Sequence, residues 1–140
     1  MKVEEQEHIK QKGYAEAMRY IANAKELLIK AGQDGRYYKD RKYVRSACGT
    51  AYSGVLEALD AWFKLKGIEL PKGRRKSINF YEQNIGMLDK KMLKTLDSVY
   101  SILHICGYYD GNLDSDVIKI GFSRAKELIN LIKPSAGGAL

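Results

Sequence analysis

The residue types that most often bind metals or act as nucleophiles are scarce in this chain. The only histidines are His8 and His104, and the only cysteines are Cys48 and Cys106. None of them lies in the Cys-x-x-Cys or His-Glu-x-x-His spacing that zinc sites use. Glu5 and His8 match the Glu-x-x-His pattern of di-iron bundles once, at a terminus that we predict to be frayed, whereas such a site needs two copies. We expect no metal and no other cofactor, and we predict that both cysteines pack in the core.

A second group of candidate residues lies between positions 103 and 111, at the predicted end of a helix. His104, Tyr108 and Asp110 could line a pocket there and act as general acid or base. The alternative is structural, because the helix dipole favours histidine at a C-terminal end and the tyrosines would pack against a neighbouring helix. The sequence therefore offers these three residues as catalytic candidates only, and it favours a protein that is not an enzyme.

Positive charge is concentrated in two parts of the chain. The sequence holds 24 Lys and Arg against 17 Asp and Glu, a formal net charge of +7. One cluster, at 36–45, interleaves Arg41 and Arg45 with tyrosines such as Tyr37, which suits phosphate contacts combined with base stacking. The other, at 72–94, includes Arg74 and Arg75. The alternative is a solvated surface on which lysine and arginine stems cover the tyrosines. These five residues are our candidate contacts to nucleic acid or phosphate.

Four long segments with helical periodicity must position these residues. Apolar residues recur three and four positions apart in segments 14–31, 40–66, 87–106 and 114–133. Residues that typically end a helix follow them: Gly32, Gly67, Gly107 and Pro134. Asp114 or Ser115 is placed to cap the fourth segment.

The segment 68–85 supports two interpretations. Ser77 could cap a short helix that Gly86 ends, or the segment could be an ordered loop. No stretch alternates with a period of two, so we predict no strand. The economical architecture is all-α, an antiparallel up-down four-helix bundle with a short extra helix between helices 2 and 3. The length of 140 residues indicates one domain, at 1–134, with a flexible C-terminal tail at 135–140.

Nothing in the sequence indicates a membrane or an export signal. The first residues are acidic, whereas a signal peptide begins with a basic region and an apolar run. The longest apolar runs are far too short to span a bilayer. We therefore expect a cytoplasmic protein without a membrane partner.

Small residues form a stripe along the second segment: Ala47, Ala51, Gly54, Ala58 and Ala61. Such a stripe allows another helix to approach closely. That helix could belong to a second copy of the chain, which would make the stripe a dimer interface, or to the same chain. The sequence leaves the two alternatives evenly balanced.

Small and aromatic residues follow a characteristic order along the predicted helices: Ala17-x-x-Tyr20-x-x-x-Ala24, then Tyr43-x-x-x-Ala47-x-x-x-Ala51-Tyr52, then Tyr108-Tyr109-Asp110-Gly111. Over most of residues 10 to 133 this order resembles the HEPN-type helical domain (higher eukaryotes and prokaryotes nucleotide-binding), and in particular its small stand-alone bacterial members. The resemblance implies an up-down four-helix bundle that is usually dimeric. It also implies a place in toxin–antitoxin pairs with nucleotidyltransferases or among RNA-cleaving toxins.

The ribonucleases of that family carry an Arg followed, after four to six residues, by a His. For His104 the three permitted positions hold Asp97, Ser98 and Val99, so the motif is absent. We therefore predict a non-catalytic, HEPN-like binding module, a homodimer, that contacts RNA or nucleotide phosphates or pairs with a nucleotidyltransferase-type partner. The alternatives are a divergent, metal-independent ribonuclease of the toxin type and a module that binds an acidic protein.

Overall fold

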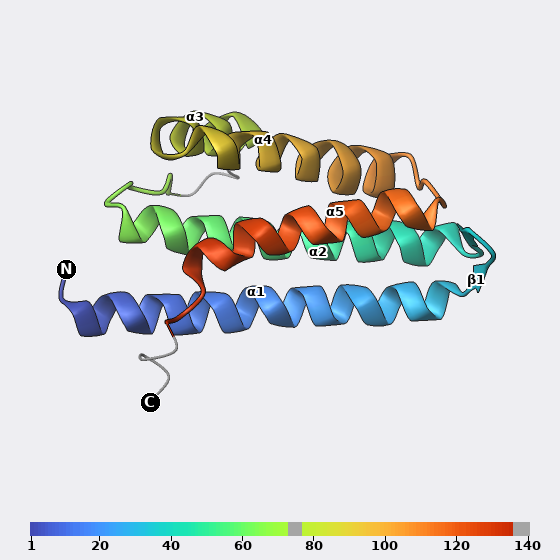
Figure 1. Cartoon of the computed structure of the whole chain (residues 1–140), viewed down its shortest axis with the longest axis horizontal. Coiled ribbons are helices and arrows are strands. Elements are labelled where there is room, and N and C mark those ends of the chain that lie inside the picture. Colours follow the sequence, from blue (N-terminus) through green and yellow to red (C-terminus); the bar gives the residue numbers. More distant parts are fainter. Residues whose placement is uncertain (73–76, 136–140) are drawn as a thin grey trace.

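Helices make up most of the chain in the computed structural model, which describes residues 1–72 and 77–135 (Figure 1). The α-helices are α1 Val3–Ala31, α2 Arg41–Leu65, α3 Ile78–Leu88, α4 Lys90–Val99 and α5 Ser115–Ile129. The π-helix η1, Tyr100–Tyr109, continues α4, and the 3₁₀-helix η2, Asn130–Ile132, continues α5. The prediction of an all-α chain is confirmed. None of the helices in the described ranges is long and apolar enough to cross a membrane.

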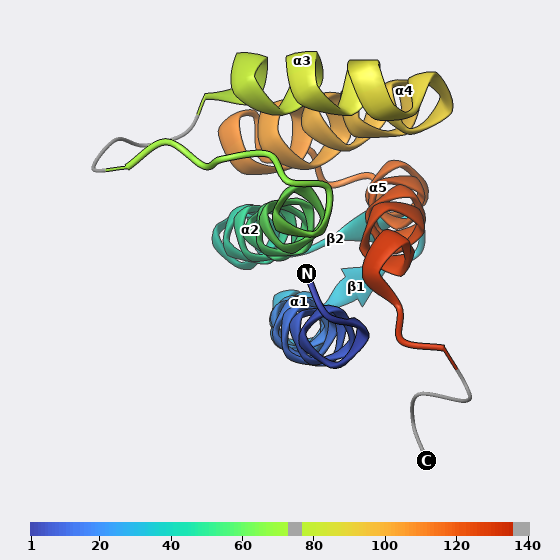
Figure 2. The ribbon, with the colours of Figure 1, turned by 90° about the vertical axis from the view of Figure 1, so that its left-hand side faces the viewer.

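Helix α2 is the central element of the molecule. It packs against α1, η1 and α5 (Figure 2). Its small-residue stripe is buried in this packing, because Ala47 and Ala51 are fully buried and Gly54 lies against Tyr20 and the Ala17 carbonyl of α1. Within one chain the stripe therefore serves the core, the second of the two alternatives that the sequence left open.

A short hairpin joins α1 to α2. Strands β1, Gln33–Asp34, and β2, Tyr37–Tyr38, pair antiparallel around a two-residue turn that begins at Gly35, whose φ of 59° is left-handed. The prediction of no strand was wrong, because strands of two residues are too short to show alternation. The backbone of Tyr37 also bridges to Asp114, so the hairpin adjoins the start of α5.

The structure corrects the predicted start of the first helix and decides between the two interpretations of segment 68–85. The terminus around Glu5 and His8, predicted to be frayed, is helical, and α1 begins at Val3 with Glu4 and Glu5 in its first turn, where the helix dipole favours acidic groups. Segment 68–85 is in part a helix, since Ser77 accepts a hydrogen bond from the Phe80 backbone N–H and caps α3. Residues 68–72 are not helical.

Two glycines expected to end helices lie inside them. Gly86 is within α3, and the chain breaks instead at Asp89, whose extended backbone ends α3 and whose side chain caps α4 by accepting from Met92 N–H. Gly107 lies inside η1 with helical backbone angles, because its missing side chain makes room for Cys48 on α2. Gly107 therefore serves packing rather than termination, which periodicity alone does not distinguish.

Candidate functional site

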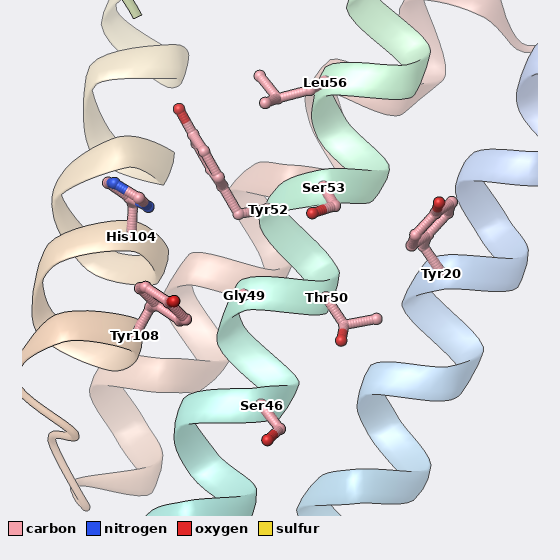
Figure 3. Close-up of a pocket in the computed structure, with 9 residues that line it drawn as sticks. All are labelled: Tyr20, Ser46, Gly49, Thr50, Tyr52, Ser53, Leu56, His104 and Tyr108. Carbon is pink, nitrogen blue, oxygen red and sulfur yellow. The ribbon is translucent and has the colours of Figure 1, made fainter. Parts of the chain in front are cut away.

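An open groove of about 410 Å³ runs along α2 between α1 and η1 (Figure 3). We call it the α2 groove. Its lining residues are Tyr20, Ser46, Gly49, Thr50, Tyr52, Ser53, Leu56, His104 and Tyr108. Its size falls within the usual range of small-molecule sites. None of these residues carries a formal charge at neutral pH with histidine neutral.

Two glycines of α2 let aromatic side chains form the walls of the groove. A Cβ atom at Gly49 would lie 2.9 Å from Cδ1 of Tyr108, so the tyrosine ring rests on the helix backbone. A Cβ atom at Gly54 would lie 2.8 Å from Cβ of Tyr20, which forms the opposite wall. Between the walls, Ser46, Thr50 and Ser53 form a floor with three hydroxyl groups (Figure 3).

The π-helix η1 gathers a cluster of rings around His104. Because a π-helix closes its hydrogen bonds at i+5, residues four and five positions apart fall on one face. The His104 ring is therefore in contact with Tyr100, Tyr108 and Tyr109 of η1, at centroid distances of 5.1, 5.7 and 5.1 Å. It also stacks on Tyr52 of α2 at 4.8 Å. We call these five residues the aromatic cluster, and each such ring pair contributes about 0.5–1.5 kcal/mol beyond area burial.

The first turns of α2 bring two arginines to the end of η1. The Arg41 Nε atom donates a hydrogen bond to the Gly111 carbonyl oxygen at 3.1 Å. A Cβ atom at Gly111 would lie 2.6 Å from Cδ of Arg41 and 2.7 Å from Nε of Arg45, so both side chains lie directly against this glycine. Its φ of 65° is left-handed. Neither arginine makes an ion pair with any residue that the structure describes.

The structure separates the predicted phosphate contacts into three groups. Arg41 and Arg45 lie together, as just described. Tyr37 is 55% exposed on β2. The hairpin that contains β2 lies at the same end of the molecule as the start of α2 (Figure 1). Arg74 and Arg75 lie outside the described residues.

A third arginine of the positively charged cluster at 36–45 is paired with carboxylates. Arg36 makes an ion pair with Asp114 at 2.7 Å and lies 3.5 Å from an oxygen of Asp116. The Arg36 hydrogen bond, more than any other contact, holds the pKa of Asp114 below its ordinary value. Among the residues that the structure describes, Arg36 is therefore paired with carboxylates, whereas Arg41 and Arg45 make no ion pair.

The structure brings two of the three catalytic candidates together in the α2 groove. His104 and Tyr108 both line the α2 groove, whereas Asp110 follows the end of η1 and does not line it. The Cys48 thiol is buried, and burial raises its pKa to about 12, so it is protonated at neutral pH. Within the part of the chain that the structure describes, no cluster of His, Cys, Asp and Glu side chains could hold a metal ion.

The sequence analysis did not identify the floor of the α2 groove or the wall that Tyr20 forms. Ser46, Thr50 and Ser53 recur at spacings of four and three on α2, which is a helical face, but small polar residues are also typical of a solvated face. Tyr20 was noticed only as part of a pattern of small and aromatic residues. The pair Gly49 and Gly54 inside a helix could have indicated the groove. Glycine inside a helix costs about 1 kcal/mol of stability relative to alanine, so its presence there indicates a packing role.

Comparisons with known proteins place the chain in a family. Residues 12–134 match the family described as Domain of unknown function (DUF5618). A similar solved structure is a protein of unknown function from Dyadobacter fermentans, 42% identical, with a TM-score of 0.78 over 88% of this chain and 94% of that chain. No curated protein matches. Because the match spans most of its length, the chain belongs to the family Domain of unknown function (DUF5618).

Proposed function

We propose that the protein is a non-catalytic module that binds the phosphates of single-stranded RNA or of nucleotides. The observation that carries the proposal is the placement of Arg41 and Arg45 against Gly111, three residues after Tyr108 of the α2 groove. Guanidinium groups supply charge-assisted hydrogen bonds to phosphate, and neighbouring rings supply stacking surfaces for bases.

The position of the arginines favours an anionic ligand. Arg41, Lys42 and Arg45 occupy the first turns of α2, directly after the N-cap Asp40, whose carboxylate accepts a hydrogen bond from the Lys42 backbone N–H at 3.0 Å. Positive charge at a helix N-terminus opposes the helix dipole and costs about 0.3–1 kcal/mol per group. A phosphate bound by the arginines would reduce this cost, because it neutralises their positive charge.

The aromatic cluster supplies the second half of the proposed site. Tyr108 and Tyr109 are 46% and 61% exposed, so each offers ring surface to solvent. Their rings meet edge to face at 5.4 Å, which leaves them facing different directions. Exposed rings and arginines are the combination that single-stranded nucleic acid uses, since every base has a stacking face and every phosphate a negative charge.

The proposal includes the finer architecture and assembly that the sequence suggested. In Figure 1 the runs α1, α2, α4 with η1, and α5 alternate in direction, which supports an antiparallel up-down four-helix bundle with α3 as the extra helix. The HEPN-like character, the homodimer and the cytoplasmic location are parts of the same proposal. Light scattering of the purified protein tests the homodimer directly.

Purification with and without nuclease tests the proposed function. We expect the protein from a lysate to carry nucleic acid, seen as a raised ratio of absorbance at 260 to 280 nm, that is released by salt because phosphate contacts displace counterions. The R41A/R45A variant should emerge free of nucleic acid. The K126A/K133A variant removes the same charge from α5 and the segment after η2, and should behave as wild type. Equal retention by the two variants would contradict the proposed site.

A divergent ribonuclease is the second candidate function. It is favoured by one observation, that His104 and Tyr108 line the same groove. In this candidate they act as acid and base on bound RNA, with Asp110 in a supporting role. It predicts RNA cleavage in the presence of a metal chelator, abolished by His104→Ala. Cleavage that persists in that variant would remove it.

A protein partner is the third candidate. A nucleotidyltransferase-type partner or an acidic protein could use the same positive charge at Arg41 and Arg45. Such binding should survive nuclease treatment of the lysate, which distinguishes it from binding through RNA.

A further inference from the structure

The floor of the α2 groove is a row of hydroxyl groups. Ser46, Thr50 and Ser53 lie on one face of α2, and Ser46 and Ser53 are exposed. The hydroxyl of Thr95 donates a hydrogen bond to the Lys91 carbonyl oxygen, but none of the three floor hydroxyls is hydrogen-bonded within the part of the chain that the structure describes. Each of them can therefore donate a hydrogen bond to an acceptor that enters the groove.

Two tyrosine rings stand beside this floor at different positions along α2. Tyr108 of η1 contacts the helix at Gly49, and Tyr20 of α1 contacts it at Gly54 (Figure 3). The Arg19 guanidinium lies 5.4 Å from the centroid of the Tyr20 ring, which restricts the ring, but Arg19 does not line the groove. Because α2 rises 1.5 Å per residue, the two rings meet it about 7.5 Å apart along its axis.

The lining and the length of the groove narrow the class of ligand. No Asp, Glu, Lys or Arg is among the lining residues, so a charged group of the ligand would lose its water there without gaining an opposite charge. On α2 the lining extends from Ser46 to Leu56, which is about 15 Å of helix. The ligand is therefore elongated and uncharged, and it combines apolar surface for the rings with hydrogen-bond acceptors for the floor.

A proline-rich peptide in the polyproline II conformation meets these requirements. This helix makes no internal hydrogen bonds, so its carbonyl oxygens are free to accept hydrogen bonds from the floor. It rises about 3.1 Å per residue, so about five residues cover the length of the groove. Residues three positions apart face the same direction about 9 Å apart, which allows two prolines to reach the two rings. Such a segment is extended before it binds, so binding costs it little conformational entropy.

We propose that the α2 groove is a docking site for a proline-rich segment of a partner protein. Prolines of the segment pack on the rings of Tyr20 and Tyr108, and the hydroxyl groups of the floor donate hydrogen bonds to its backbone carbonyl oxygens. The site is separate from the proposed phosphate contacts, because neither Arg41 nor Arg45 lines the groove. The inference therefore adds a protein partner and does not depend on RNA binding.

Calorimetric titration with neutral peptides tests the proposed docking site. The probe is decaproline, acetylated and amidated so that it has no charge, and the control is a capped Gly-Ser peptide of equal length, which is flexible. We expect the full-length protein to bind decaproline at least about tenfold more tightly than the Gly-Ser peptide. Because the groove lining and the probe are both uncharged, added salt should leave this affinity unchanged.

Two substitutions with matched controls locate the binding to the groove. Tyr20→Ala should weaken decaproline binding about tenfold. Tyr43→Ala should not, although Tyr43 is also half-buried and also has a cation over its ring, Lys42 at 5.2 Å, because it does not line the groove. Ser53→Glu places a longer, charged side chain on the floor and should abolish binding, whereas Ser123→Glu adds the same charge at an exposed position of α5 and should have no effect.

Three outcomes would overturn the inference. The first is decaproline binding no tighter than that of the Gly-Ser peptide, or equal in wild type and Ser53→Glu, a comparison that decides the matter if Tyr20→Ala does not fold by circular dichroism. The second is binding that is lost in R41A/R45A but kept in Ser53→Glu, which would place the peptide at the arginines. The third is a dimer that light scattering finds in wild type and not in Ser53→Glu, which would assign the groove to a second copy of the chain. Retention of nucleic acid tests the proposed function separately from all three.

Discussion

Gly111 is the residue on which the proposed phosphate site depends most closely. Replacing it by alanine would bring a Cβ atom within 2.7 Å of Nε of Arg45 and would strain a left-handed backbone, at about 1–2 kcal/mol. We expect Gly111→Ala to lower the free energy of unfolding by about that much and to weaken RNA binding, because both arginines are displaced. Denaturant titration and anisotropy measure the two effects.

Gly67 provides the control for this variant. Its φ of 76° is also left-handed, but a Cβ atom there would meet no atom within 4 Å. Gly67→Ala should therefore lose stability through backbone strain and keep RNA binding. If both variants bind RNA equally well, the packing of the arginines on Gly111 does not organise the site.

The buried thiol of Cys48 should resist alkylation in the folded protein. Burial raises its pKa to about 12, and only the thiolate reacts with alkylating agents. We expect iodoacetamide at about pH 8 to leave Cys48 unmodified in the folded protein and to modify it in denaturant. Mass spectrometry of tryptic peptides reads the result. Rapid modification of the native protein would mean that η1 does not cover this part of α2.

The contact between η1 and α2 can be tested by a pair of substitutions. Gly107→Ala inserts a methyl group where the Cys48 side chain lies, and overpacking of this kind costs about 1–3 kcal/mol. Cys48→Ala frees that space, so the double variant should be more stable than the sum of the two single effects. Denaturant unfolding of the four proteins measures the coupling. Strict additivity would show that the two residues are not in contact.

The start of α5 yields a prediction of pH dependence. Asp114 accepts hydrogen bonds from Arg36 and from the Asp116 and Val117 backbone N–H groups, and the Arg36 bond chiefly lowers its pKa. A lowered pKa stabilises the fold above the ordinary carboxyl pKa, and this stability is lost as pH falls through the lowered value.

Asp114→Asn keeps an oxygen that can cap the helix but has no charge to lose. Its melting temperature should therefore fall less than that of wild type between about pH 7 and about pH 3. Thermal unfolding followed by circular dichroism gives the two pH profiles. Parallel profiles would show that the pair of Asp114 with Arg36 is not formed in solution.

The sequence predicted elements better than it predicted their junctions. Periodicity placed the long helical segments, and cap residues such as Asp114 were recognised because their role is local. The hairpin, the long π-helix and the roles of Gly86 and Gly107 depend on contacts with distant residues. The same limit applies to the candidate site, since Arg45 becomes a neighbour of Gly111 only after folding.

At the scale of the whole molecule, the positively charged cluster at 36–45 and the candidate residues at 103–111 come together at one end of the fold. The hairpin, the start of α2 and the connection between η1 and α5 lie together there (Figure 1). Arg41 therefore contacts Gly111, two residues after Tyr109 of the aromatic cluster, although 70 residues separate Arg41 and Gly111 in sequence. This convergence of positive charge and exposed rings is the central claim for RNA binding.

The salt dependence of RNA binding tests this claim most directly. Plotting the logarithm of the binding constant against that of salt concentration for a labelled oligoadenylate gives the number of phosphate contacts. For single strands each contact contributes a slope of about −0.7. Loss of Arg41 and Arg45 should make the slope of R41A/R45A shallower by about 1.4, along with weaker binding. A slope and an affinity unchanged from wild type would contradict the account.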